Sequence, residues 1–266
     1  MKNWISSFAG VCLLAYSLVA CVKDTKQVAT PAEPVSSETI AKIAALGFGT
    51  AEVQRIDEGY LVEGDIVLTE ADLSAVRPAT PSLVIAQEEQ YNTNNLVRVN
   101  TKRNITVSVS GDVPSGFSNA VNAALARYNT LNLTITFSRV ASGGNIDIRI
   151  VNSGQYIASA GFPTNSGDPY SQVKYSRKYI NYSAGFMTTV VAHEIGHCIG
   201  FRHTDYMNRS YSCGIGGNEG DGGVGANHIP GTPTGPDAKS WMLACLSSTT
   251  DRPFNNNDKT ALNYLY

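Results

Sequence analysis

The sequence is poor in the residues that most often bind metals or form disulfides, and neither sign of charge dominates it. Among 266 residues there are five cysteines and four histidines, and the formal net charge is -2. Lys and Arg form no cluster that could bind a phosphate backbone, so the sequence argues against a nucleic acid partner. No second long apolar run follows the one near the N-terminus, so we expect no further membrane-inserted segment.

The first twenty residues predict a lipoprotein-type signal peptide. A basic start at Lys2 precedes an apolar run that is too short for a bilayer-spanning helix with its usual flanks. Residues 18–21 (LVAC) resemble a bacterial lipobox, which implies cleavage before Cys21 and lipidation of its thiol. The alternative is an ordinary cleavage near Ala20 beside an incidental cysteine. We therefore expect a protein of the bacterial cell envelope that meets the membrane only through a lipid anchor, or that is secreted after processing.

The chain between this leader and residue 96 predicts a tether and then a pro-segment. Residues 21–36 are polar and contain two prolines, which is typical of a flexible tether. Residues 37–95 predict a propeptide and linker, with a helix over 37–47, a strand or hairpin arm over 60–68, and a linker and processing region over 78–95. A unit of this size is marginal as an independent fold, so we expect it to lie on the rest of the chain.

The most informative stretch is His193–His203, which contains three of the four histidines. His193 and His197 are four residues apart, so on a helix both imidazoles reach one cation from the same face. Glu194 is turned away from the first histidine by about 100° and can lie beside the metal as a proton acceptor. Gly200 permits a sharp turn that returns His203 as a third ligand.

Three imidazoles leave one position of a tetrahedral zinc ion open, which is typical of catalytic rather than structural zinc. A histidine pair on a helix is by itself often a structural feature. The full H-E-x-x-H-x-x-G-x-x-H spacing instead fixes three ligands, a base and a turn, and it predicts a hydrolytic zinc site with Glu194 as general base and acid.

This motif resembles that of the metzincin zinc endopeptidases. The run from His193 to Asp205 (HEIGHCIGFRHTD) is most similar to the bacterial dual-action HEIGH metallo-peptidase family, and the similarity continues in residues 208–219, 225–234 and 240–246. The resemblance implies an α+β, zincin-like catalytic domain over residues 96–266, in which a twisted mixed sheet and an active-site helix follow the small pro-segment.

The expected elements of this domain agree with the periodicity of the sequence. An exposed edge strand would bind an extended peptide substrate as an added strand. The expected strands are 104–109, 134–140, 146–151, an edge strand at 155–163 and a last strand at 178–182, and the expected helices are 115–131, 185–198 and 257–266.

The resemblance also implies roles for residues outside the zinc motif. Met242 would form the Met-turn, an apolar floor beneath the histidines. In metzincins a cysteine or an aspartate of the pro-segment commonly blocks the metal. Because the pro-segment has no cysteine beyond Cys21, the candidates are Asp57, Asp65 and Asp72, and Asp65 is preferred because it follows a glycine.

Several assignments stay open at the level of sequence. Asp205 either orients the ring of His203 or fixes the turn. Glu219 and Asp221 could hold calcium, although a solvated glycine-rich loop is the simpler interpretation. Two disulfides are conceivable, Cys213 with Cys245 or Cys198 with Cys213.

Two functions compete on this evidence. The first is a monomeric, exported, lipid-anchored zinc endopeptidase that cleaves extended peptides or proteins. The second is a surface lipoprotein that binds peptides or glycans in the same cleft without cutting them. Because the motif lacks neither a ligand nor its glutamate, the first is favoured.

Overall fold

The computed structural model describes residues 34–46, 48–50, 52–74, 90–152, 156–220 and 224–266, and the chain from Glu33 to Tyr266 forms one compact unit. The signal peptide, Cys21, most of the tether and residues 75–89 of the predicted linker lie outside the described residues. In the part of the chain that is described, no helix has the length and apolar character needed to cross a bilayer.

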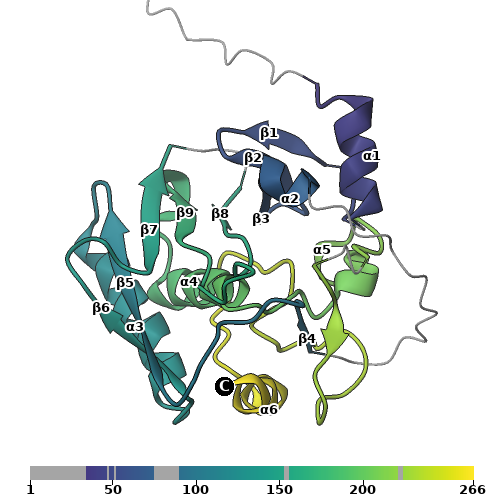
Figure 1. Cartoon of the computed structure of the whole chain (residues 1–266). Coiled ribbons are helices and arrows are strands. Elements are labelled where there is room, and N and C mark those ends of the chain that lie inside the picture. The colour runs from purple at the N-terminus through teal and green to yellow at the C-terminus, as the bar shows by residue number, and fades with distance from the viewer. Residues whose placement is uncertain (1–33, 47, 51, 75–89, 153–155, 221–223) are drawn as a thin grey trace, which may run out of the picture. The chain divides into compact units, whose positions relative to one another are not determined.

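The pro-segment folds into a small α+β unit (Figure 1). Helix α1 (Ser37–Ala45) is capped by Ser36, whose side chain accepts a hydrogen bond from the Thr39 backbone N–H. An antiparallel sheet follows, with strands β1 (Gln54–Ile56), β2 (Gly59–Val62) and β3 (Ile66–Leu68). The short helix α2 (Glu70–Ser74) closes the unit.

The predicted strand or hairpin arm over 60–68 is a hairpin, and its turn has an unusual backbone. Glu63 and Gly64 both have positive φ, at 57° and 90°. A positive φ costs free energy for a residue with a side chain but little for glycine. The turn thereby places Asp65 at the start of β3, facing the larger part of the chain.

The larger sheet has the strand order β6-β5-β7-β9-β8 (Figure 1). All neighbours are parallel except β8, which pairs antiparallel with β9 at one edge, so the sheet is mixed as predicted. The strands are β5 (Arg103–Ser110), β6 (Ile135–Arg139), β7 (Ile146–Val151), β8 (Ala158–Ser159) and β9 (Gln172–Ser176).

One predicted strand is misplaced. The last strand is Gln172–Ser176, whereas the predicted 178–182 begins within the 3-10 turn η1 (Arg177–Tyr179). Val173 and Tyr175 both bury their side chains completely, which selects the earlier register. The residues of 178–182 do not alternate strictly, because Tyr179 and Ile180 are adjacent, and they lie in the connection to the next helix.

Helices α3 (Ser115–Asn129) and α4 (Ala184–Cys198) pack against each other and against the sheet. The observed α4 agrees with the predicted 185–198, and the Ser183 side chain accepts a hydrogen bond from the Phe186 N–H at its start. Every residue of α4 from Phe186 to Cys198 is buried. The helix therefore holds its histidines in a rigid, dry interior.

The chain after α4 has little regular structure. It contains the 3-10 turn η2 (Tyr206–Asn208), helix α5 (Ser210–Cys213), strand β10 (Asn227–His228) and helix α6 (Asn256–Leu265). Cys213 and Cys245 form a disulfide with a Cα–Cα distance of 5.1 Å, which decides between the two pairings, and Cys198 is buried and free. This disulfide ties α5 to the segment after Met242.

Residues 90–95, which the sequence analysis assigned to the linker, are built into this second half. Strand β4 (Tyr91–Asn92) pairs with β10, and the Tyr91 carbonyl accepts a hydrogen bond from the Arg202 N–H. The buried side chain of Gln90 donates to Ser240 Oγ at 3.1 Å and to Asp258 Oδ1 at 2.6 Å. Residues 90–95 therefore pack as part of the second half of the chain.

Asp258 joins the N-terminus of α6 to the segment around Met242. Its carboxylate also accepts hydrogen bonds from the backbone N–H groups of Asn255 and Trp241. Burial nevertheless outweighs these donors and raises the pKa of Asp258 to about 7.

We therefore expect Asp258 to make the protein less stable as pH rises from about 4 to about 7. An unfolded aspartate loses its proton near its ordinary pKa of 3.8, whereas the folded one keeps it until about 7, so within this window only the folded state binds the proton. The contribution is at most about 1.4 kcal/mol per pH unit. Urea unfolding between about pH 5 and pH 8 should show this slope reduced in Asp258→Asn and retained in the exposed control Asp112→Asn; an equal slope in both variants would contradict the assignment.

Candidate metal centre

Three imidazoles converge where α4 ends. His193 and His197 lie one turn apart on α4, and their Nε2 atoms are 3.0 Å from each other. Gly200, with φ of 109°, then reverses the chain so that the His203 ring lies 4.9 Å from the His197 ring, centroid to centroid. A Cβ at Gly200 would lie 2.7 Å from the Leu96 side chain and 3.0 Å from the Asn95 carbonyl oxygen, so the turn needs glycine for space as well as for its backbone angle.

The Nδ1 atom of each ring faces an oxygen that can only accept a hydrogen bond. The acceptor is the Trp241 carbonyl for His193, at 2.8 Å, and the Phe201 carbonyl for His197, also at 2.8 Å. For His203 it is the carboxylate of Glu219, at 3.0 Å. In each ring a proton is therefore on Nδ1, which leaves Nε2 as the atom that would bind a metal. In the latent form His203 Nε2 faces Asp65 Oδ2, and although burial opposes the charge, Asp65 and Glu219 raise the pKa of His203 well above its usual value.

This arrangement fits a bound cation. Two Nε2 lone pairs at 3.0 Å repel each other unless a positive charge lies between them, and the spacing approaches the roughly 3.3 Å expected of two nitrogens that each bind zinc at about 2.0–2.1 Å. Burial, together with the neighbouring histidines, lowers the pKa of His197 well below its usual value, which keeps the ring neutral as a ligand must be. The donor set of three imidazoles matches the preference of zinc.

Glu194 lies beside this group rather than in it. The side chain is almost completely buried, and its Oε2 has no hydrogen-bond partner among the described residues. Burial, and then the charge of Asp65, raise the pKa of Glu194 well above the usual value for a carboxyl. A carboxylate with a raised pKa next to a metal site is suited to taking up and returning a proton.

Met242 packs against α4 where the sequence analysis expected the Met-turn. It is fully buried, and a Cβ added to Gly196 would lie only 2.5 Å from its Sδ. The glycine between the two histidines of α4 is therefore needed because the methionine approaches the helix backbone there. The neighbouring Trp241 carbonyl is also the acceptor for His193, so this segment both supports and orients the ligands.

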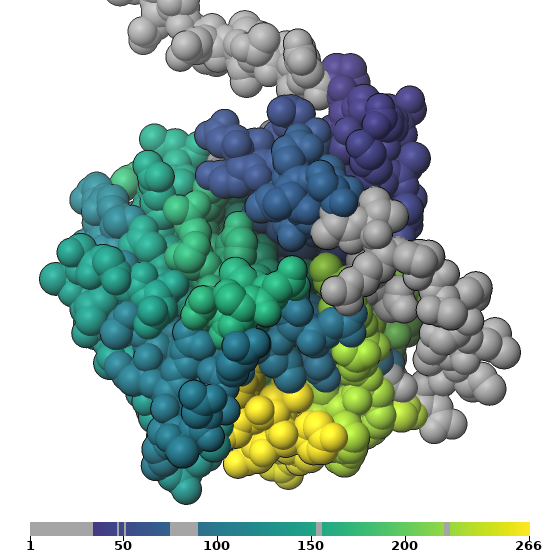
Figure 2. All heavy atoms as spheres, in the orientation of Figure 1, coloured from purple at the N-terminus to yellow at the C-terminus, as the bar shows by residue number. Residues whose placement is uncertain are grey.

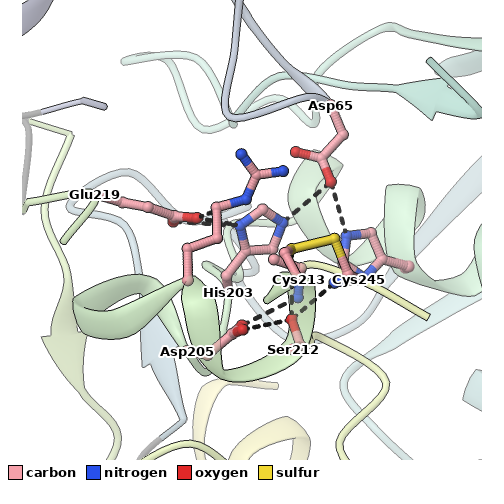
Figure 3. Close-up of a disulfide and its surroundings, with 10 residues drawn as sticks. Asp65, His203, Asp205, Ser212, Cys213, Glu219 and Cys245 are labelled. Carbon is pink, nitrogen blue, oxygen red and sulfur yellow. Dashed lines mark hydrogen bonds and ion pairs between the residues drawn. A yellow bond between two sulfur atoms is a disulfide. The ribbon is translucent and has the colours of Figure 1, made fainter. Parts of the chain in front are cut away.

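Asp65 of the pro-segment lies with the three histidines, and Figure 3 shows its carboxylate beside His203. Its Oδ2 lies 3.1 Å from His203 Nε2 and 3.5 Å from His193 Nε2, and its oxygen and the three ring nitrogens all lie within 4.8 Å of one another. Although burial opposes ionisation, His203 and His193 lower the pKa of Asp65 well below its usual value, so the group is an anion. A carboxylate oxygen thus lies where a fourth zinc ligand would be.

The other two aspartates that the sequence analysis considered lie elsewhere. Asp72 accepts hydrogen bonds from the Thr69 N–H and hydroxyl at the start of α2, and Asp57 is exposed. Among the three candidates, Asp65 is the one that the structure brings to the histidines.

Glu219 is a residue of the site that sequence reasoning did not assign. It lies sixteen positions beyond His203 in the glycine-rich loop, is almost fully buried, and accepts the Nδ1–H of His203 (Figure 3). Arg202 lies 3.6 Å from Glu219 and 3.8 Å from Glu63 of the pro-segment. No motif spacing could have revealed this contact, because it depends on how the loop folds back.

Asp205 contacts the turn after His203 and not the His203 ring. Its carboxylate accepts hydrogen bonds from the Ser212 hydroxyl at 2.6 Å and from the Ala244 N–H at 3.0 Å, so it fixes the turn beside the disulfide (Figure 3). Orientation of the His203 ring falls to Glu219 instead. Glu219 accepts a hydrogen bond from His203 and Asp221 lies outside the described residues, so the calcium site stays a prediction.

The pro-segment covers the sheet edge that the sequence analysis expected to bind substrate. The Val67 N–H donates to the Ala160 carbonyl at 2.8 Å, and the Ala160 N–H donates to the Asp65 carbonyl at 2.9 Å. In Figure 2 the blue atoms of the pro-segment lie directly against the teal and green atoms of the sheet and α4 side. The pro-segment therefore extends this edge as an added strand would.

A cavity of about 180 Å³ adjoins the metal centre. Its walls come from the pro-segment, from the region before β8, from α4 and from the segment after Met242. The lining includes Asp65, Ile157, Val190, Glu194, Arg209 and Leu246.

We expect Glu219→Ala to lower zinc affinity by about 10–100-fold, because loss of the hydrogen bond to His203 frees the orientation of that ligand ring. The matched variant Asp205→Ala removes a carboxylate that touches the turn but not the ring, so it should lower thermal stability and leave zinc affinity within a few-fold. Competition with a chromophoric chelator measures both. The reverse ranking would show that Asp205, not Glu219, orients the ligand.

Comparisons with known proteins agree with this geometry. A search of curated proteins finds no match. Two solved structures of myroilysin are similar at 16% and 17% identity, cover 65% and 60% of this chain and 96% and 83% of their own, and have TM-scores of 0.45 and 0.39, which are too low to argue from. The family model described as dual-action HEIGH metallo-peptidase matches residues 60–266, a match that includes every histidine of the centre. The chain thus has a zincin-like fold and belongs to the dual-action HEIGH metallo-peptidase family, a family of zinc metallopeptidases.

Proposed function

We propose that this protein is an exported, lipid-anchored zinc endopeptidase that is synthesised in a latent form. The observation that supports peptidase activity is the set of three Nδ1 contacts. They aim three Nε2 atoms at one point beside a buried glutamate. His193, His197 and His203 would hold the metal. Zinc bound there would polarise the scissile carbonyl and acidify a water molecule.

Glu194 then handles the protons of the reaction. Its free Oε2 accepts a proton from the attacking water, and the same oxygen later delivers it to the nitrogen of the leaving amine. Burial is the largest cause of the raised pKa of Glu194 in the latent form, and a carboxyl beside the metal centre can both take up and return a proton.

The substrate would lie along the edge of the sheet at β8. That edge has backbone groups able to bind an extended chain, as the contacts of Ala160 with the pro-segment illustrate. Asp65 and the strand β3 occupy this edge and the fourth ligand position together. The pro-segment therefore supports a latent enzyme that becomes active when this segment is removed.

Export and lipidation rest on the sequence alone. The lipobox-like LVAC and the polar residues that follow support cleavage before Cys21 and a tether to the membrane. Metabolic labelling with a radioactive fatty acid would test this proposal: label should enter the wild-type chain and be absent from Cys21→Ser.

Glu194→Ala should retain zinc and the fold but cleave protein substrate about 10²–10⁴-fold more slowly, because the proton acceptor is gone. Casein cleavage by the processed enzyme, with zinc counted in the same sample, measures this. Asp112→Ala, an exposed carboxylate variant, is the control. Full proteolysis by Glu194→Ala would dispose of the mechanism.

Asp65→Ala in the full-length chain should raise peptidase activity by about tenfold or more, since one charge-assisted contact with the metal centre is lost. Asp57→Ala and Asp72→Ala remove carboxylates that do not reach the histidines and should stay as latent as the wild type. Initial rates on a quenched fluorescent peptide distinguish these cases. If Asp65→Ala stayed latent while Asp72→Ala became active, the block would not be due to Asp65.

A further inference from the structure

The pro-segment places acidic side chains against basic side chains of the rest of the chain, residues 90–266, which we call the peptidase part. These contacts are not confined to the metal centre. Besides Asp65, Glu58 forms an ion pair with Lys174 of β9. Glu63 lies 3.8 Å from the fully buried Arg202, but burial and then the charge of Glu219 raise the pKa of Glu63 well above its usual value, so Glu63 does not count as a negative charge. These side chains are largely removed from solvent, where the attraction between opposite charges is stronger than in water. The pro-segment therefore marks positions at which the peptidase part accepts acidic groups.

Among the described residues, Arg209 is a further cation at this contact that forms no ion pair with the pro-segment, although Asp65 lines the same cavity. The side chain of Arg209 is 14% exposed and lies 3.7 Å from Glu219, while its Nε has no hydrogen-bond partner among the described residues. The pro-segment places Gly64 opposite it, and a Cβ at that position would lie 2.9 Å from Arg209 Nη2. A residue with a side chain in place of Gly64 would thus direct that side chain at the guanidinium.

Arg209 also lines the cavity of about 180 Å³ beside the metal centre, together with Glu194. Val190 and Leu246 make other parts of this wall apolar. An apolar wall that ends in a buried guanidinium suits a side chain with methylene groups and a terminal carboxylate.

Removal of the pro-segment leaves this region with an excess of positive charge. Lys174 loses Glu58, while Arg202 and Arg209 share the remaining carboxylate of Glu219. Cations in a partly desolvated cleft attract anionic ligands and select them over neutral ones.

Resting on the peptidase function proposed above, we propose that Arg209 is a specificity-determining residue that makes the enzyme favour substrates with an acidic side chain next to the scissile bond. The carboxylate of the substrate takes the place that Gly64 leaves open before activation. Lys174 and Arg202 add to the preference by attracting further acidic residues of the same substrate.

The test uses the full-length chain with a recognition sequence for a specific protease inserted between Ser74 and Gln90, cut after folding and freed of the pro-segment. Paired peptides that differ only by Glu or Gln at each position around the scissile bond give the ratio of kcat/KM values. We expect Glu to be favoured by about tenfold at one position or more, and Arg209→Gln to bring that ratio close to one. Arg209→Lys should restore part of it, and Arg149→Gln, which changes an exposed arginine on β7, should leave it unchanged.

A binding measurement separates this proposal from the peptidase function. In the Glu194→Ala background, calorimetry with the same peptide pairs gives affinities without catalysis. If the processed wild-type enzyme hydrolysed none of the peptides, but binding still showed a preference for Glu that depends on Arg209, the peptidase assignment would be overturned and the acidic site supported. Efficient hydrolysis with equal ratios in wild type and Arg209→Gln would overturn the acidic site and leave the peptidase assignment standing.

Discussion

The structure depends on three buried imidazole rings whose Nε2 atoms point towards one another. Carbonyl and carboxylate acceptors fix a proton on the outer nitrogen of each ring, so the inner nitrogens face one another as acceptors at distances as short as 3.0 Å. Such a cluster is repulsive without a cation. Several separate parts of the chain hold this cluster in place. They are helix α4, the turn at Gly200, the Trp241 carbonyl and the loop that carries Glu219.

The same need for charge compensation explains the contacts of the pro-segment. Its carboxylates meet buried cations of the peptidase part, with Asp65 at the histidines and Glu58 beside Lys174. A buried charge that loses its partner costs several kcal/mol or more. Release of the pro-segment must therefore be followed by entry of water or of other anions, and this links the latent form to the kind of substrate that the cleft favours.

The sequence predicted those features that follow a fixed periodicity or spacing. The helix 185–198, the convergence of His193 and His197 and the turn at Gly200 are local, and each could be derived from helix geometry or from the freedom of glycine. Strand order depends on packing between distant segments and was less accessible. The alternation of residues 172–176, in which Val173 and Tyr175 are buried, marks β9 better than the predicted 178–182, where Tyr179 and Ile180 are adjacent.

Contacts that cross long loops could not be predicted. Glu219 reaches His203 from a glycine-rich loop without any periodic pattern, and Gln90 was assigned to a linker because its buried partners, Ser240 and Asp258, are about 150 residues or more away. The choice between Cys213–Cys245 and Cys198–Cys213 had the same cause. For Glu219 and Gln90 the energetic reason is a buried polar group that needs a partner, and the sequence does not show where that partner will be.

The most direct test of the metal centre is zinc K-edge X-ray absorption on the full-length chain loaded with one equivalent of zinc. The account predicts nitrogen and oxygen neighbours only, at about 2.0–2.1 Å, with the multiple-scattering pattern of three imidazoles. A sulfur neighbour at about 2.3 Å, or fewer than three imidazoles, would contradict it.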